Sequence, residues 1–373
     1  MECMRCGNRS KRYFAVYQGK TVCRRCIGFT GDIADIQANS GEVSIHLPFR
    51  LSETQRKASK TIYQASLLKD VLVNAVCGAG KTELVYETIA KTLEASKTIG
   101  LAIARKQVVL QLAKRLTGAF PGIRVQAICE GHTNILDAQL FVVTTHQLYR
   151  FPRMFDCLIL DEPDAFPYVG DELLEGFARM ACRGRMIYLT ATPDREMLRR
   201  VKKQEMVEVM VNVRPHGYPL PVPSIRCAPY FIQLILVKRW VEKTKGRKLV
   251  FVPTIRQAVF IARLFKWKQV SAKSKDLQEK IDEFANNEDG VLICTTVLER
   301  GVTFENAQVC VVMAQHPVFN EASLVQIAGR AGRSPRYPKG EVLFLCGYKS
   351  RSCLNCMNIL LRSNKDASFA STP

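Results

Sequence analysis

Long hydrophobic runs are missing from this 373-residue sequence. The longest candidates, such as residues 230–237, fall well short of the roughly 20 apolar residues that a membrane-spanning helix needs. The N-terminus also lacks the apolar core of a secretory signal peptide. These absences argue against a membrane-spanning or secreted protein, and we expect a cytoplasmic one.

Acidic residues are scarce relative to basic ones. The 54 Lys and Arg residues exceed the 34 Asp and Glu residues by 20, which gives a net charge of +20. This balance favours a partner that is dense in phosphate, although an inert basic surface would have the same composition. Fourteen cysteines in a cytoplasmic protein indicate free thiols and metal ligands rather than a disulfide scaffold.

The chain divides into four segments by composition. Residues 1–46 are rich in cysteine and basic residues, and they predict a small module that needs a metal to fold. Residues 47–213 and residues 224–373 each alternate short apolar runs with helical stretches, which predicts two parallel-sheet α/β domains. The proline-rich residues 214–223 predict an extended connector. The expected strands are residues 71–73, 100–103, 141–143, 158–160, 186–189, 249–252, 291–294, 309–313 and 342–345.

A glycine-containing loop follows the first expected strand at residues 71–73. It carries Gly78 and Gly80, then Lys81 and Thr82, and we expect a helix to begin at the loop. Backbone N–H groups of such a loop, together with a helix N-terminus, point at phosphate oxygens. Lys81 would then reach the β- and γ-phosphates, and Thr82 would hold Mg²⁺. The alternative is an ordinary turn that contains Gly-Lys-Thr.

Two adjacent carboxylates, Asp161 and Glu162, follow the apolar run at residues 158–160. Beside a phosphate loop, Asp161 can hold Mg²⁺ through water, and Glu162 can orient and deprotonate an attacking water. The alternative is a solvated acidic turn. The hydroxyls of Thr190 and Thr192 follow another strand and could link a nucleotide site to a nucleic-acid site through hydrogen bonds.

The stretch from Gln326 to Arg333 contains two arginines at helical spacing. Gln326, Arg330 and Arg333 are at positions i, i+4 and i+7, so on a helix they would share one face. Two arginines on one face can clamp a transferring phosphoryl group as arginine fingers. The alternative is a basic solvated helix, but Gly329 and Gly332 weaken a helix without serving its surface.

Four N-terminal cysteines have the pattern C-x₂-C-x₁₆-C-x₂-C, which is typical of a zinc ribbon. Each pair can approach one ion from a tight turn, and four thiolates close a tetrahedral structural site. The alternative is four reduced thiols without a metal. The expected zinc ligands are Cys3, Cys6, Cys23 and Cys26.

The order of these motifs resembles that of the superfamily-two helicases. The resemblance implies an α/β fold of two RecA-like parallel-sheet domains in tandem, with ATP and Mg²⁺ between them. It implies catalytic roles for Lys81, Asp161, Glu162, Gln326, Arg330 and Arg333. It implies nucleotide contacts by Gln55 (at adenine), Gly78, Gly80, Lys81, Thr82, Asp161 and Gly301. It implies contacts with a nucleic-acid strand by Arg105, Thr145, His146, Gln147, Thr295 and Arg300.

The combination of a zinc ribbon with the stretches AVCGAGKTEL, DEPDAFPY and RPHGYPLPVP resembles the late competence ComFA family. That resemblance implies a DNA-dependent ATPase that acts on single-stranded DNA entering the cell during natural transformation. It also implies a ComFC-type partner and the membrane DNA-uptake machinery, which would bring the protein to the inner face of the membrane. The alternatives are a PriA-type replication-restart helicase, an RNA helicase, and a DNA-binding adaptor that ATP switches without turnover.

Overall fold

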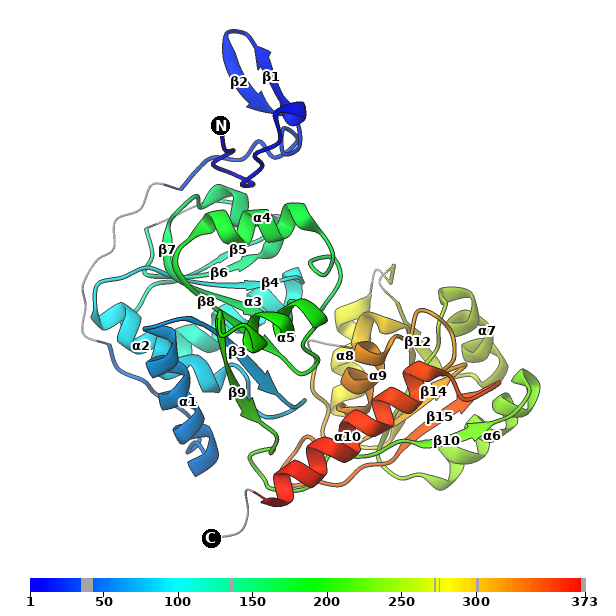
Figure 1. The fold of residues 1–373 in the computed structure, drawn as a ribbon. Coiled ribbons are helices and arrows are strands. Elements are labelled where there is room, and N and C mark those ends of the chain that lie inside the picture. Colours follow the sequence, from blue (N-terminus) through cyan, green and yellow to red (C-terminus); the bar gives the residue numbers. More distant parts are fainter. Residues whose placement is uncertain (35–42, 135–136, 272, 275, 300–301, 370–373) are drawn as a thin grey trace. The chain divides into compact units, whose positions relative to one another are not determined.

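The computed structural model describes residues 1–34, 43–134, 137–271, 273–274, 276–299 and 302–369 (Figure 1). Its contacts divide the chain into two compact units. The first unit contains Met1–Ala75 and Lys81–Val211, and the second contains Val76–Gly80 and Asn212–Pro373. The boundaries expected at residues 46, 213 and 223 stay predictions. None of the helices in the described part of the chain combines the length and apolar character that crossing a bilayer demands.

The first unit is built on a seven-stranded parallel sheet with the strand order β5-β6-β4-β7-β8-β3-β9. Its central strands are almost entirely buried, which is why they read as continuous apolar runs. The strands are β3 (Asp70–Ala75), β4 (Ile99–Ile103), β5 (Val125–Ile128), β6 (Leu140–Thr144), β7 (Phe155–Asp161), β8 (Cys182–Thr190) and β9 (Met206–Val211). The helices are α1 (Glu53–Ser66), α2 (Tyr86–Glu94), α3 (Lys106–Ala119), α4 (Glu172–Ala181) and α5 (Arg195–Lys202).

The second unit has a six-stranded parallel sheet with the strand order β10-β15-β14-β11-β13-β12. Two parallel sheets of this kind confirm the predicted fold class. The strands are β10 (Ser224–Cys227), β11 (Arg247–Phe251), β12 (Lys268–Val270), β13 (Gly290–Cys294), β14 (Ala307–Val312) and β15 (Val342–Cys346). The helices are α6 (Tyr230–Lys243), α7 (Ile255–Phe265), α8 (Leu277–Asn286), α9 (Glu321–Ala328) and α10 (Arg351–Phe369).

Each strand run expected from the sequence overlaps a strand of these sheets. The strands that the sequence did not indicate, β5, β9, β10 and β12, are the edge strands of the two sheets. An edge strand is partly solvated, so it does not need a continuous apolar run. Residues 214–223 contain neither helix nor strand, as expected for a connector.

Residues 1–34 form a small element of the first unit. A 3₁₀ helix, η1 (Lys11–Tyr13), leads into an antiparallel hairpin of β1 (Phe14–Tyr17) and β2 (Lys20–Cys23). The turn between these strands is tight, because Gln18 and Gly19 have φ of 48° and 73°. The hairpin places Cys23 on its second strand beside the cysteines that precede the hairpin.

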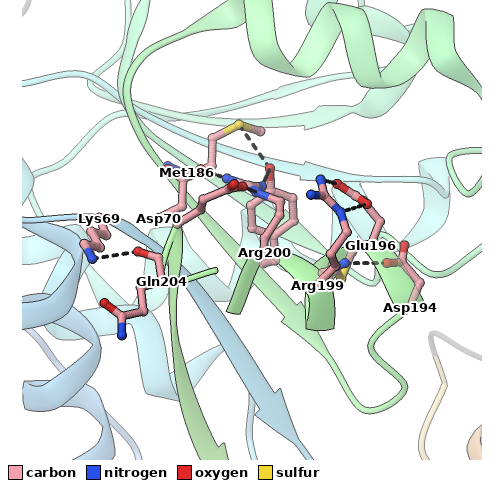
Figure 2. A network of polar contacts seen from close by, with 11 residues as sticks. Lys69, Asp70, Met186, Asp194, Glu196, Arg199, Arg200 and Gln204 are labelled. Carbon is pink, nitrogen blue, oxygen red and sulfur yellow. Dashed lines mark hydrogen bonds and ion pairs between the residues drawn. The ribbon is translucent and has the colours of Figure 1, made fainter. Parts of the chain in front are cut away.

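A polar network fixes α5 against the sheet of the first unit (Figure 2). Asp70, at the start of β3, accepts hydrogen bonds from the backbone N–H of Met186 at 2.9 Å and from the guanidinium of Arg200 at 2.6 Å. Arg200 also donates to the hydroxyl of Tyr188 at 3.2 Å. These contacts join β3, β8 and α5, and so they support the strand whose carboxyl end carries Thr190.

Candidate nucleotide and nucleic-acid site

The expected phosphate loop follows β3. Gly78 and Gly80 have φ of +85° and +81°, a conformation that glycine adopts without strain. The next element is a 3₁₀ helix, η2 (Glu83–Val85), which continues directly into α2 at Tyr86, so a helix does begin at the loop, with its first turn in the 3₁₀ form. The loop geometry supplies the turns that a phosphate cradle needs.

Lys81 stands directly after this loop. Its Nζ is buried and makes no hydrogen bond within the described residues, and it lies 3.9 Å from Oε1 of Glu162. A buried ammonium that lacks hydrogen bonds is costly, and phosphate oxygens would satisfy it. Lys81 and the loop before it therefore fit a bound nucleoside triphosphate.

Glu162 has an unusual backbone conformation at the end of β7. Its φ is +55°, which few residues other than glycine adopt. Its N–H donates to the carbonyl of Leu189 in the neighbouring strand β8 at 2.9 Å, which helps to hold this conformation. Such a held backbone fixes the direction in which the carboxylate leaves the sheet edge.

Asp164 is a residue that the sequence analysis did not single out. Its carboxylate accepts hydrogen bonds from the hydroxyls of Thr190 at 2.6 Å and Thr192 at 2.8 Å. The Thr190 hydroxyl in turn accepts from the N–H of Thr192 at 3.0 Å. The two motifs after β7 and β8 are thus joined by hydrogen bonds, while a link from a nucleotide site to a nucleic-acid site through these hydroxyls stays a prediction.

The expected strand contacts of the first unit share an edge with the carboxylates. The strands β4, β6 and β7 run parallel, and Ile103 aligns with both Thr144 and Asp161. Arg105 and Thr145 follow Ile103 and Thr144 closely in sequence, so they lie at the same carboxyl edge as Asp161. Function in open α/β sheets concentrates at this edge.

The segment after β6 is a 3₁₀ helix, η3 (Thr145–Arg150). It leaves the side chain of His146 exposed, while the hydroxyl of Thr145 is buried with no hydrogen-bond partner among the described residues. Gln147 accepts from Arg150 at 3.5 Å. The assignment of strand contacts to these residues and to Arg105 stays a prediction.

Gln55 has a structural task in this conformation. It is buried, and its Oε1 accepts the N–H of Ser52 at 3.0 Å, while its own N–H donates to the Ser52 hydroxyl at 3.2 Å. This reciprocal pair is a capping box that begins α1. Recognition of adenine by Gln55 stays a prediction.

The prediction that Gln326, Arg330 and Arg333 share one face of a helix is wrong in part. Gln326 lies on α9 and is buried, but α9 ends at Ala328. Arg330 and Arg333 therefore follow the helix instead of sharing its face. The chain turns again at Gly332, whose φ is +64° and where a Cβ would lie 2.6 Å from the carbonyl oxygen of Pro338.

Both arginines are held by backbone carbonyls. Arg330 is 2% exposed and donates through Nε to the carbonyl of Glu299 at 3.1 Å, and Arg333 donates to the carbonyl of Gly329 at 2.8 Å. Their catalytic roles, and that of Gln326, stay predictions.

Thr295 precedes the 3₁₀ helix η4 (Thr296–Leu298) at the carboxyl end of β13. Arg300 and Gly301 lie outside the described residues.

Arg214 supports the same turn from the connector. It is 1% exposed and donates to the carbonyls of Gly329, Ala331 and Gly332. Burial, together with the charge of Arg333, lowers the pKa of Arg214 to about 10. An arginine in a proline-rich connector gives no sequence signal for this role.

The four N-terminal thiols have the geometry of a tetrahedral metal site. Their sulfur atoms all lie within 4.8 Å of one another, with Cys3 and Cys26 3.6 Å apart and Cys6 and Cys23 3.8 Å apart. Zn–S bonds of about 2.3 Å imply sulfur separations of about 3.8 Å. Burial raises the pKa of Cys6 to about 11 and also raises that of Cys26, so these two thiols need a cation to stay ionised. The cluster is compatible with zinc.

Comparison with known proteins agrees with this arrangement. Residues 48–195 match the family model "Type III restriction enzyme, res subunit", and residues 230–335 match "Helicase conserved C-terminal domain". The solved structure titled "S. cerevisiae Dbp5 bound to RNA and ADP BeF3" is similar in fold, with a TM-score of 0.65 and 16% identity over 85% of this chain and 88% of that one. The two sheets and their motifs define an ATP-dependent helicase motor of superfamily two.

Two competence proteins are similar over most of the chain. Competence protein ComFA of Bacillus subtilis (strain 168) is 34% identical, covering 97% of this chain and 85% of that protein. Competence protein ComFA of Streptococcus pneumoniae (strain ATCC BAA-255 / R6) is 35% identical, covering 85% and 78%. This chain belongs to the ComFA family. It is a DNA helicase or translocase of competence.

Proposed function

We propose that this protein is an ATP-driven translocase that moves along single-stranded DNA and assists the uptake of transforming DNA. The observation that carries the proposal is the shared carboxyl edge of the first sheet. The register that aligns Ile103 with Thr144 and Asp161 brings Asp161 to the same sheet edge as Arg105 and Thr145, which supports the proposal. A change at the nucleotide can thus reach a bound strand over a short path.

Each motif residue has a defined task in this proposal. Lys81 binds the β- and γ-phosphates, Asp161 holds Mg²⁺ through water, and Glu162 orients the attacking water. Arg330 and Arg333 of the second unit stabilise the charge that develops in the transition state. Mg²⁺ supplies charge neutralisation on the phosphates when it is bound.

Translocation fits the chain better than processive unwinding. Outside the two sheets with their helices, the regular structure in the described residues is limited to η1 and the β1–β2 hairpin. In the segment at residues 150–156, a possible strand-separating wedge, Phe151 and Phe155 are fully buried, and Arg153 is the exposed residue. Its aromatic side chains are therefore not available to stack between the bases of a duplex at the fork.

Two assays on the same preparation test the proposal. We expect ATP-dependent displacement of streptavidin from a biotinylated single strand and weak unwinding of a tailed duplex, with Lys81→Ala inactive in both. Phe166 is 84% exposed in the loop between β7 and α4, so it is the residue to replace when testing for a side chain that separates the strands of a duplex. Phe166→Ala should leave displacement unchanged. Efficient unwinding of long duplexes by the protein alone would contradict a translocase.

The cellular setting is part of the same proposal. We infer a cytoplasmic protein that reaches the inner face of the membrane through a ComFC-type partner and the DNA-uptake machinery. The four cysteines would hold one structural zinc ion.

A further inference from the structure

The cysteine module of residues 1–34 is packed against the first unit. Cys6, Cys23 and Cys26 belong to the same apolar cluster as the core around Phe177. Phe29 packs edge-on against two aromatic rings, with centroids 5.1 Å from Tyr149 and 4.8 Å from Phe177. The module is therefore a fixed part of this unit.

Backbone hydrogen bonds tie the module to η3 in particular. The N–H of Gly31 donates to the hydroxyl of Tyr149 at 2.9 Å, and the N–H of Ala34 donates to the carbonyl of Arg150 at 2.7 Å. Arg150 also donates through Nε to the carbonyl of Asp32 at 2.9 Å. The module thus lies next to the segment that carries His146, an expected strand contact.

The module also has a defined contact with α4. A Cβ on Gly176 would lie 2.3 Å from the carbonyl oxygen of Cys6, so this glycine is needed for the close approach. Arg25 forms an ion pair with Glu172 at 2.6 Å, and the hydrogen bond that Arg25 donates to this carboxylate raises the pKa of Arg25. Contacts with both η3 and α4 set the direction in which the hairpin extends.

The two faces of the hairpin differ. Phe14 pairs with Cys23 on the face toward the cysteine cluster, whereas Tyr17 pairs with Lys20 on the opposite face. Tyr17 is 63% exposed, and Lys20 is also exposed. We call Tyr17 and Lys20 the hairpin face. Arg12 of the preceding η1 is also exposed, whereas Tyr13 packs partly against the core cluster.

The chemistry of the hairpin face suits a nucleic-acid strand. The guanidinium of Arg12 lies 4.7 Å from the centre of the Tyr13 ring. Basic residues exceed acidic ones by seven to two within residues 1–34. They are Arg5, Arg9, Lys11, Arg12, Lys20, Arg24 and Arg25, against Glu2 and Asp32. Cations with interleaved aromatic rings bind single strands without sequence preference, because phosphates meet the charges and bases stack on the rings.

We propose that the hairpin face is a second binding site for single-stranded DNA, which continues the strand track from η3. This inference rests on the proposed function, since it needs a strand bound at η3. Its physical basis is the fixed position of the module beside η3 together with the charge and the exposed aromatic ring of the hairpin. The site would lengthen the grip on the strand without taking part in hydrolysis.

Oligothymidines of stepwise increasing length test the inference by fluorescence anisotropy on the zinc-loaded full chain. The test variant is Tyr17→Ala with Lys20→Ala, and Tyr17→Phe is the conservative variant that keeps the ring. Lys97→Ala is the matched control, because Lys97 is exposed but precedes β4 and so lies at the opposite edge of the sheet. Zinc content is measured for each variant to confirm that the module has kept its metal.

We expect the short oligonucleotides to bind all four proteins equally and to stimulate ATP hydrolysis equally. Oligonucleotides that are long enough to reach the hairpin should bind the parent more tightly than short ones do. They should bind the double variant about tenfold more weakly than the parent, as expected for the loss of one stacked base. The slope of log affinity against log salt concentration should be smaller in magnitude by about 0.7 for the double variant, as expected for the loss of one phosphate contact. Tyr17→Phe and Lys97→Ala should match the parent.

Other outcomes overturn the inference in distinguishable ways. If the parent binds and hydrolyses ATP but shows no gain with length, or if the double variant keeps that gain, the hairpin does not bind the strand. If the double variant loses affinity equally at every length, the hairpin is not a second site. If no single strand binds or stimulates the parent, the proposed function fails, and the inference fails with it.

Discussion

Replacing Asp164 by alanine removes the carboxylate that joins the motifs after β7 and β8. The Thr190 side chain is fully buried, so its hydroxyl would lose an acceptor without access to water, at a cost of about 1–3 kcal/mol. Thr192 is half-buried, and water can replace its bond, so its loss adds about 1 kcal/mol. We expect a total loss of stability of about 2–4 kcal/mol in the first unit. Asp164→Asn should lose less, because an amide can still pair with both hydroxyls.

Urea unfolding followed by hydrogen exchange in β7 and β8 measures this loss. Both tryptophans, Trp240 and Trp267, belong to the second unit, so fluorescence would not report on it. Asp194→Ala is the matched control, because Asp194 caps α5 through the N–H of Met197 at 2.8 Å and contributes about 1 kcal/mol without touching either motif. Asp164→Ala should also lower the streptavidin displaced per ATP hydrolysed, and Asp194→Ala should not. Unchanged exchange and unchanged coupling in Asp164→Ala would refute this role.

Four further substitutions test the site and the contact between the cysteine module and α4. Lys81→Ala should abolish both ATP binding and hydrolysis. Glu162→Gln should abolish hydrolysis but keep near-normal binding of a fluorescent ATP analogue. If Lys81→Ala hydrolyses ATP at the parent rate, the loop assignment is wrong. Arg330→Ala should lower kcat far more than ATP affinity, because an arginine finger acts on the transition state, and equal losses would place it in ground-state binding. Gly176→Ala should push the module away from α4 and increase hydrogen exchange in η3, because its Cβ would meet the carbonyl of Cys6. Exchange in η3 equal to the parent's would show that the module does not support that segment.

The sheet interiors could be predicted because their strands are buried on both sides. Runs such as residues 141–143 and 158–160 consist of apolar residues for that reason, and they became β6 and β7. The edge strands could not be found in the same way. β9 mixes buried, half-buried and exposed positions and contains Glu208, so its sequence carries no continuous apolar signal.

The site residues that could not be predicted from the sequence were missed for a different reason. Asp164 pairs with Thr190 only because β7 and β8 are neighbours, and strand order is not readable from a single sequence. Spacing alone placed Arg330 and Arg333 on a helix, whereas α9 ends at Ala328 and the chain turns again at Gly332, whose φ is positive. The four cysteines were predictable because their spacing itself encodes the metal geometry.

The rate of ATP hydrolysis by the zinc-loaded protein, with and without single-stranded DNA, tests the central claim most directly. The account predicts strong stimulation by a single strand, weak stimulation by duplex, and a steep fall in stimulation with added salt. Glu162→Gln measured in parallel gives the background. ATP that binds tightly but is not hydrolysed faster when single-stranded DNA is present would contradict a motor and would favour an ATP-switched adaptor.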